Sequence, residues 1–250
     1  MTIILITGAS RGIGASAALH CAARGMGVIV TYNSHPHGAD AVVDAIQGKG
    51  GKAAALQLDV SDIASFAAFR TTLAATLAAT WQRDTFDGLV NNAGFGNFGA
   101  IEALPEDHFD ALFKVHLKGP FFLTQALLPL LADGGHIVNM TSATTRVATP
   151  GAAPYAAFKG GLEVLTRYMA KEFGARGVRA NAISPGAIRT DMTSDAFTQA
   201  PEFETMLAGQ TALGRIGEAD DVSKAIASLL GSDNGWVNAQ TIEVGGGYNI

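Results

Sequence analysis

Short apolar runs alternate with longer stretches of helical periodicity along the chain. The apolar runs are rich in β-forming residues and span Ile3–Thr7, Val28–Thr31, Ala53–Leu58, Gly88–Asn91, His136–Thr141, Arg179–Ser184 and Gln240–Val244. The helix-like stretches between them include Ser61–Trp81, Glu106–Leu131 and Pro154–Ala175. This alternation predicts right-handed crossovers and a parallel sheet, and runs that are apolar throughout are typical of strands covered on both faces.

We therefore expect a doubly wound α/β fold, a Rossmann fold with three layers. No fixed-period repeat and no long polar linker divides the chain, so residues 1–250 are expected to form a single domain. In such a fold ligands bind outside the carboxyl ends of the strands, and the residues that follow each apolar run are the ones to inspect.

Composition and charge exclude several other classes of protein. Apolar residues make up 48% and charged residues only 16%, whereas a disordered chain has low hydrophobicity and high charge. The net charge of −5 disfavours a nucleic-acid-binding protein that relies on net basic charge. Cys21 is the one cysteine, which excludes an internal disulfide and fits a reducing compartment.

Neither a secretion signal nor a membrane span is expected. The first residues, MTIILITGAS, lack a basic segment and run directly into a glycine loop. The apolar stretch FFLTQALLPLL, which starts at Phe121, contains Thr124 and Gln125 and is too short to cross a bilayer. We expect a soluble, cytoplasmic protein without a membrane partner.

The segment TGASRGIG, residues 7–14, predicts a phosphate-binding loop. It lies between the first predicted strand and an alanine-rich helix, where glycines let the backbone approach a pyrophosphate and the helix N-terminus offers free N–H groups. Its glycine spacing is G-x-x-x-G-x-G. For an isolated loop with this spacing, a glycine turn without a ligand is the alternative. The position of the loop between a strand and a helix of a parallel-sheet pattern favours dinucleotide binding. The candidate contacts are Gly8, Ser10, Arg11, Gly12, Ile13 and Gly14.

The end of the second predicted strand indicates the cofactor. An NAD site places a carboxylate on the ribose 2′-hydroxyl at this point, and an NADP site uses basic groups. No acidic residue occurs before Asp40, and Arg11, Asn33 and Ser34 are candidates to hold a 2′-phosphate. The sequence thus favours NADP(H) and leaves NAD(H) possible. The nearby segment His35–His37 has no further ligand cluster, so no metal site is predicted.

Three residues with reactive side chains follow the fifth predicted strand. Ser142 comes directly after it, Tyr155 lies thirteen residues further on, and Lys159 follows Tyr155 by four residues on a predicted helix. Residues four apart share a helix face, and a nearby cation lowers the pKa of a tyrosine from about 10. Such a tyrosine protonates a carbonyl oxygen as hydride arrives at the carbon, while a serine hydroxyl hydrogen-bonds the same oxygen. An isolated Tyr-x-x-x-Lys pair, by contrast, is typical of an ordinary helix surface.

In combination, these motifs resemble those of the short-chain dehydrogenase/reductase family in its compact single-domain form. The resemblance rests on TGASRGIG, NNAG at 91–94, a serine thirteen residues before YAAFK, and SPGAIRT at 184–190, and it runs from Ile3 to Gly247. It implies that Tyr155 is the proton donor and acceptor. Lys159 would bind the nicotinamide ribose and lower the pKa of the tyrosine, and Ser142 would orient the substrate carbonyl. The family includes 3-oxoacyl-[acyl-carrier-protein] reductases and glucose dehydrogenases.

The resemblance also implies further cofactor contacts and an assembly. The pair Asp59 and Val60 would contact adenine, the NNAG residues would support the cofactor near the central strand, and the SPGAIRT segment would line the carboxamide. The residues implied in the two segments are Asn91, Ala93, Gly94, Pro185, Gly186, Ile188 and Thr190. The two longest helices resemble those of the family's four-helix interface, so a homotetramer or homodimer is expected.

His116 departs from the family pattern, which commonly has Asn at this position in a proton relay through a water. One interpretation is that the imidazole only satisfies the same local hydrogen bonds. The other is that His116 joins the relay and adds a titration near its usual pKa of about 6.5.

Residues 191–217 are helix-like and resemble the mobile lid of the family, whose closure would exclude water from hydride transfer. Apolar side chains that would line the substrate, or equally belong to the core, are Phe95, Phe98, Met192, Phe197 and Phe203. Arg146 is a candidate for an anionic group on the substrate, and a solvated loop arginine is the simpler interpretation. Basic side chains that an acidic acyl carrier protein would need are Lys114, Lys118, Arg146, Arg167 and Lys171; the net charge leaves that partner open.

The sequence therefore predicts an NADP(H)-dependent oxidoreductase acting on a small-molecule carbonyl or alcohol. The alternative is a Rossmann protein that senses NADP(H) without catalysis, which would not need Ser142, Tyr155 and Lys159 at reactive spacing. A sugar-nucleotide epimerase is disfavoured, because the chain lacks a second substrate domain and the G-x-x-G-x-x-G loop.

Overall fold

A parallel sheet organises the molecule. The computed structural model describes residues 1–250 except for the side chains of Asp195 and Ala196. Among the described residues, seven strands pair in the order β3-β2-β1-β4-β5-β6-β9, all parallel. Their bounds are β1 Ile3–Ile6, β2 Gly27–Tyr32, β3 Ala53–Gln57, β4 Phe86–Asn91, β5 Leu131–Met140, β6 Arg179–Pro185 and β9 Thr241–Val244. The order reverses at β1, so the doubly wound fold expected from the sequence is confirmed.

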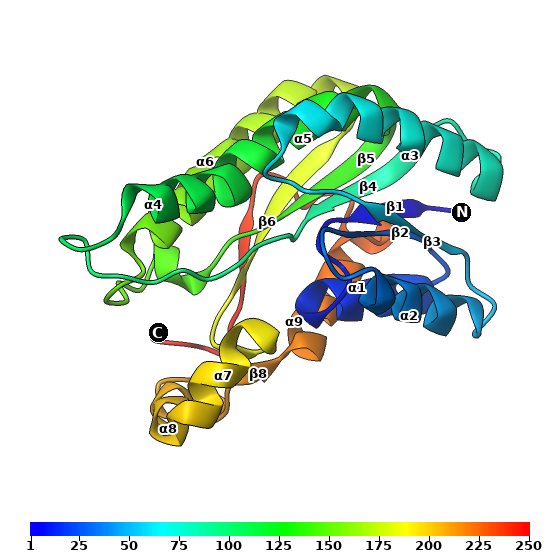
Figure 1. Ribbon diagram of the computed structural model, residues 1–250. Helices are drawn as coiled ribbons and strands as arrows, with labels where there is room; N and C mark the ends of the chain where they lie inside the picture. Colours follow the sequence, from blue (N-terminus) through cyan, green and yellow to red (C-terminus); the bar gives the residue numbers. More distant parts are fainter.

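Helices cover both faces of the sheet (Figure 1). One layer contains α3 Phe66–Trp81, α4 Glu106–Phe113, α5 Gly119–Leu127 and α6 Ala153–Phe173, and the other contains α1 Gly12–Ala23, α2 Pro36–Gln47 and α9 Ala219–Leu229. Helices α7 Asp191–Gln199 and α8 Pro201–Gly209 stand apart beyond the ends of the strands, next to the two-residue strands β7 Ile188–Arg189 and β8 Gly217–Glu218.

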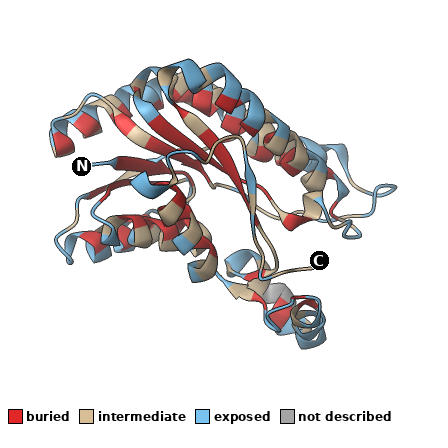
Figure 2. Cartoon of the chain, turned by 180° about the vertical axis from the view of Figure 1, so that it is seen from behind, coloured by how far each residue is buried: buried red, intermediate tan, exposed pale blue. Residues whose placement is uncertain are grey.

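Each helix layer packs its own apolar core against the sheet, and Figure 2 shows the buried residues running along the strands and the inner helix faces. Ile4, Ile6 and Val30 point to the core beneath α1, α2 and α9, whereas Leu5 and Ile29 point to the core beneath α3, α5 and α6. Alternation along a strand sends neighbours to opposite faces, so strands that are apolar throughout fill both cores.

The stretch Ile63–Trp81, which includes α3, is long enough and apolar enough, at a mean hydropathy of 1.2, to meet the length and composition of a membrane span. Phe66, Phe69, Leu73 and Leu77 nevertheless lie on one side and are buried in the core. Their spacing of three or four residues is that of a helix with one face on a core. The high mean hydropathy comes from the buried Phe and Leu side chains together with the many Ala residues of the outer face, which carries few charges.

Two local features were not anticipated from the sequence. The predicted helix Glu106–Leu131 is interrupted by a π-helical turn at Lys114–Lys118, and β5 already begins at Leu131. The short parallel pair β7–β8 joins Ile188 to Gly217. A π-turn inserts one extra residue and changes where the following side chains point, and His116 lies at its centre.

Candidate active site

The glycine loop is held in a conformation that only glycine fits well. Gly8 and Gly12 have φ of 61° and 56°, a region that costs other residues energy. A Cβ on Gly8 would lie 2.8 Å from the Cα of Ala93, and one on Gly14 would lie 2.5 Å from Asn92 Nδ2. The loop therefore packs directly on the segment that follows β4. The N–H groups of Gly8 and Ala9 donate to Thr31, whereas the first N–H groups of α1 have no partner within the helix and suit a phosphate.

Asn92 holds this arrangement together, a role that was not predicted. Its side-chain amide donates to the carbonyl oxygens of Thr7 and Gly8 at 2.8 and 3.1 Å, and its backbone N–H donates to the Thr7 hydroxyl at 2.9 Å. The predicted neighbour, Asn91, points the other way: its amide donates to Asn139 Oδ1 at 2.8 Å inside the core. The NNAG motif contains both residues, and strand alternation alone decides which one reaches the loop.

The end of β2 lies close to the glycine loop. A Cβ on Gly38, in the first turn of α2, would lie 2.5 Å from the carbonyl oxygen of Ser10, so this turn packs against the loop. Asn33 and Ser34 immediately precede it and are exposed. Arg11 is exposed and approaches the exposed carboxylate of Asp191 at 3.6 Å. Contacts of Arg11, Asn33 and Ser34 with a 2′-phosphate all stay predictions.

Ser142, Tyr155 and Lys159 come together at the carboxyl end of β5. Ser142 follows β5, and Tyr155 lies in the first turn of α6. Lys159 lies one turn further on, with Nζ 5.6 Å from the centre of the Tyr155 ring and donating to the Met140 carbonyl at 2.6 Å. The Ser142 oxygen accepts hydrogen bonds from the Thr144 N–H and hydroxyl, so its own O–H is available for donation to another acceptor.

Burial favours the neutral forms of this group. It raises the pKa of Tyr155 to about 12, against the lowering effect of the Ser142 hydrogen bond, and it lowers the pKa of Lys159 to about 7. Desolvation of the phenolate is the larger effect here, and the expectation that Lys159 lowers the pKa of Tyr155 stays a prediction. Tyr155 is a protonated phenol at neutral pH, the form that donates a proton.

His116 lies beside Tyr155 but does not titrate near neutrality. Its ring meets the Tyr155 ring edge-on at 5.0 Å, and Nε2 hydrogen-bonds the Phe95 carbonyl at 2.8 Å. Burial, and secondarily the Lys159 ammonium, lower its pKa to about 3. This lowered pKa argues against a titration near 6.5, and the participation of His116 in a proton relay stays a prediction. The neutral ring donates from Nε2, and among the described residues Nδ1 has no hydrogen-bond partner.

The other predicted cofactor residues lie at the same edge of the sheet. Thr190 packs near Gly12, where an added Cβ would lie 3.8 Å away. Pro185 ends β6, and Ile188 is buried in the core beneath α1. Asp59 accepts hydrogen bonds from the backbone and hydroxyl of Ser61 at 2.8 and 2.7 Å, and Val60 is buried under the α3 layer.

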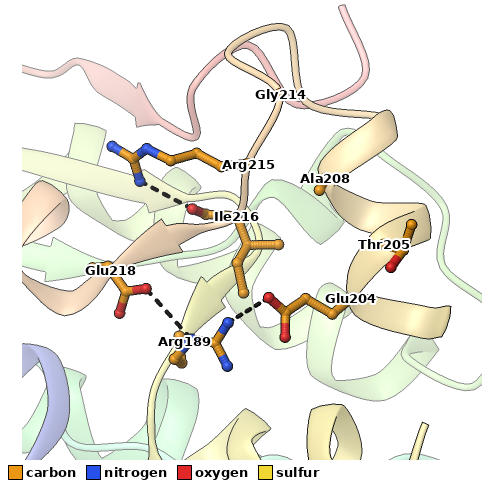
Figure 3. A pocket seen from close by; sticks show the side chains of 8 residues that line it. All are labelled: Arg189, Glu204, Thr205, Ala208, Gly214, Arg215, Ile216 and Glu218. Atoms are coloured by element: carbon orange, nitrogen blue, oxygen red, sulfur yellow. Dashed lines mark hydrogen bonds and ion pairs between the residues drawn. The ribbon is translucent and has the colours of Figure 1, made fainter. Parts of the chain in front are cut away.

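The lid region is fastened to β7 and β8 through Arg189. Its guanidinium pairs with Glu204 on α8 and with Glu218 at the end of β8, as Figure 3 shows. These residues line a cavity of about 320 Å³ together with Arg215, which pairs with Asp221. Both arginines in this cavity are thus neutralised by carboxylates, and Tyr155, Ser142 and Lys159 are not among its lining residues.

The predicted apolar wall divides into two groups. Phe98 is 60% exposed with its ring 6.1 Å from that of Tyr155, and Phe95 packs on His116 at 5.5 Å. Met192 is exposed and lies near Gly96. Phe197, by contrast, is buried in the small core of the lid with Phe203 stacked on it, so these two belong to lid packing.

Arg146 is not free to bind an anion. Its guanidinium donates to both carboxylate oxygens of Glu243 at 2.6 and 2.9 Å and to the carbonyl oxygens of Tyr248 and Asn249 at 2.7 Å each. The candidate role of Arg146 in receiving an anionic substrate group is not supported, because four of its five N–H donors are engaged within this chain.

Comparisons with known proteins agree with this geometry. Residues 8–249 match the family model described as Enoyl-(Acyl carrier protein) reductase. The chain is 40% identical to an uncharacterized oxidoreductase of Methylorubrum extorquens, over 98% of this chain and 96% of that one. It is 36% identical to the 3-oxoacyl-[acyl-carrier-protein] reductase of Staphylococcus aureus, over 97% and 96%. A short chain dehydrogenase of Burkholderia cenocepacia, solved in complex with NADP, superposes with a TM-score of 0.89 at 32% identity, covering 100% and 98%.

Replacing His116 should leave the shape of the pH–rate profile unchanged. With its pKa at about 3, the imidazole is neutral from pH 5.5 upward, so His116→Asn removes no titrating group in that range. The profile of log kcat/KM between pH 5.5 and 8 tests this, with exposed His108→Asn as the matched control. An acidic limb near pH 6.5 that disappears only in His116→Asn would contradict the neutral assignment.

Proposed function

The chain belongs to the short-chain dehydrogenase/reductase family and is an oxidoreductase, and from this premise we propose that Tyr155, Ser142 and Lys159 carry hydride transfer between NADP(H) and the carbonyl or secondary alcohol of a small molecule. The observation that carries the proposal is the geometry at the carboxyl end of β5, where Lys159 Nζ lies 5.6 Å from the centre of the Tyr155 ring and donates to the carbonyl of Met140, two residues before Ser142. A proton donor, a hydrogen-bond donor and a dinucleotide cradle thus meet at one edge of the sheet.

The residues present fit NADP(H). Gly8 and Gly14 leave no room for side chains where the backbone must approach a pyrophosphate, and Asn33 and Ser34 stand where an NAD site has a carboxylate. The NADP held by the Burkholderia cenocepacia relative supports the same cofactor. When bound, the nicotinamide supplies or accepts the hydride. The residues proposed to hold the cofactor are Gly8, Ser10, Arg11, Gly12, Ile13, Gly14, Asn33, Ser34, Asp59, Val60, Ala93, Gly94, Tyr155, Lys159, Pro185, Gly186, Ile188 and Thr190.

Tyr155 would hand its hydroxyl proton to the carbonyl oxygen as that oxygen gains negative charge. The free O–H of Ser142 would hydrogen-bond the same oxygen. Lys159 keeps N–H groups beyond the one given to Met140, and these would hold hydroxyls of the nicotinamide ribose. A phenol that is protonated at neutral pH can give its proton during reduction, and the same group must lose that proton before it can accept one during oxidation.

Tyr155→Phe should abolish turnover and keep the cofactor. Removing one hydroxyl deletes the proton donor and leaves the packing, so kcat should fall by about 10² to 10⁴. NADPH oxidation across a panel of β-ketoacyl thioesters, α-diketones, quinones and cyclic ketones measures kcat, and quenching of protein fluorescence measures NADPH binding. Binding without turnover by the wild-type chain on the whole panel would instead favour the non-catalytic sensing protein.

Asn33→Asp should reduce the preference for NADPH. A carboxylate at the end of β2 repels the 2′-phosphate and accepts from the 2′-hydroxyl of NAD(H), so the ratio of kcat/KM for NADPH over NADH should fall by about tenfold, which is ~1.4 kcal/mol. Asn33→Ser is the control without the charge. An unchanged ratio in Asn33→Asp would place the 2′-phosphate elsewhere.

We also propose that residues 1–250 act as one unit in a homodimer or homotetramer in the cytoplasm, where the free thiol of Cys21 is stable; cell fractionation checks the location. The outward faces of α4, α5 and α6 leave large apolar side chains in water, and such a patch is typical of a subunit interface. These side chains are Phe109, Phe121, Val164 and Tyr168, between 43% and 62% exposed.

Val164→Glu should therefore reduce the size of the assembly. The substitution puts a carboxylate into the apolar patch one helical turn from Tyr168, and burying that charge in an interface is costly. Light scattering after size-exclusion chromatography measures the mass, with Leu19→Glu on α1 as the control. A wild-type chain that runs as a monomer would contradict the proposal.

A further inference from the structure

Arg146 connects the loop of Ser142 to the end of the chain. Ser142 opens a tight turn in which the N–H of Thr145 donates to the Ser142 carbonyl at 3.1 Å and the N–H of Arg146 donates to the Ala143 carbonyl at 3.0 Å. Because these hydrogen bonds make the turn a single rigid piece, a displacement of Arg146 is passed to Ser142. The guanidinium of Arg146 forms a bidentate pair with the Glu243 carboxylate through two parallel hydrogen bonds, the strongest geometry for such a pair.

Tyr248 and Asn249, whose carbonyl oxygens also accept from the Arg146 guanidinium, belong to a segment that we call the C-terminal strap, residues 245–250. The strap packs closely against the loop after β6, because a Cβ on Gly186 would lie only 2.8 Å from the Cα of Gly245. It also holds the turn that follows α8, where the N–H of Leu213 donates to the Gly246 carbonyl at 3.1 Å and the N–H of Asn249 donates to the Gln210 carbonyl at 2.9 Å. The strap therefore touches the serine loop, the proposed nicotinamide loop and the base of the lid.

From these contacts we infer that Arg146 is a positioning residue: through Glu243 and the C-terminal strap it sets the position of Ser142 relative to the Pro185–Gly186 loop. The inference rests on the proposed function for its consequence, since Ser142 must meet the substrate oxygen while the Pro185–Gly186 loop meets the cofactor. A misplacement of about 1 Å between such groups lowers a rate by up to about 10².

The pair of Arg146 and Glu243 is suited to alignment more than to overall stability. Their side chains are 38% and 42% exposed, and exposed ion pairs contribute little to folding. Arg176 provides a matched comparison, because it pairs with Asp133 and donates to two backbone carbonyls at a similar exposure of 36%. Its partners lie around the start of β5, at the opposite end of that strand from Ser142.

The test compares Arg146→Met with Arg176→Met. Kinetics on the substrate found in the panel should show a loss of at least about tenfold in kcat/KM for Arg146→Met, NADPH affinity within about twofold of wild type, and unchanged kinetics for Arg176→Met. Arg146→Lys keeps the charge but loses the planar set of guanidinium donors, so its kcat/KM should lie between those of wild type and Arg146→Met. The kcat/KM of Glu243→Gln should lie in the same range. If Arg146→Met does not fold, these two variants replace it in the comparison.

Hydrogen exchange measured by mass spectrometry separates this inference from the proposed function. Faster exchange in residues 142–149 and 245–250 of Arg146→Met, with neither segment changed in Arg176→Met, supports the positioning role even if no panel substrate turns over. Equal exchange in the two variants, or equal kcat/KM, would overturn it.

Discussion

The close approach of two chain segments at the carboxyl ends of β1 and β4 is the constraint on which the site depends. Gly8 lies against Ala93, and Gly14 lies against Asn92, at distances that leave no room for a Cβ. The amide of Asn92 bridges the remaining gap by donating to Thr7 and Gly8. This contact places the start of α1 at the point where the strand order reverses, between β1 and β4, which is where such folds bind ligands.

Desolvation governs the electrostatics of the same region. Tyr155, Lys159 and His116 all shift toward their neutral forms, although one is an acid and two are bases. A site that keeps water out penalises every charge alike, so the phenol retains its proton and the imidazole remains a neutral neighbour. The proton that the proposed reaction needs is thus carried by the Tyr155 hydroxyl. Because Thr144 donates to the Ser142 oxygen, the Ser142 O–H remains to donate to the same substrate oxygen in the proposed reaction.

Segments far apart in the sequence meet around this group. The turn after β5, the loop after β6 and the end of α8 are all held by residues 245–250, and Arg146 and Arg189 tie loops to carboxylates from other elements. Such ties are exposed and individually weak. These contacts affect the position of one segment relative to another, since each contact joins two segments that carry different parts of the site.

The sequence by itself determined the strands, the order of the helices, the glycine loop and the triad of Ser142, Tyr155 and Lys159, because periodicity and short spacings act locally along the chain. It could not decide which asparagine of NNAG braces the loop, since alternation along β4 turns Asn91 into the core and Asn92 toward Thr7. Nor could it decide the protonation of Tyr155 and His116 or the partners of Arg146, because these depend on burial and on residues about a hundred positions away. Spacing can show which groups share a helix face. Only the folded molecule determines how much water surrounds those groups and which distant carboxylate pairs with a given guanidinium.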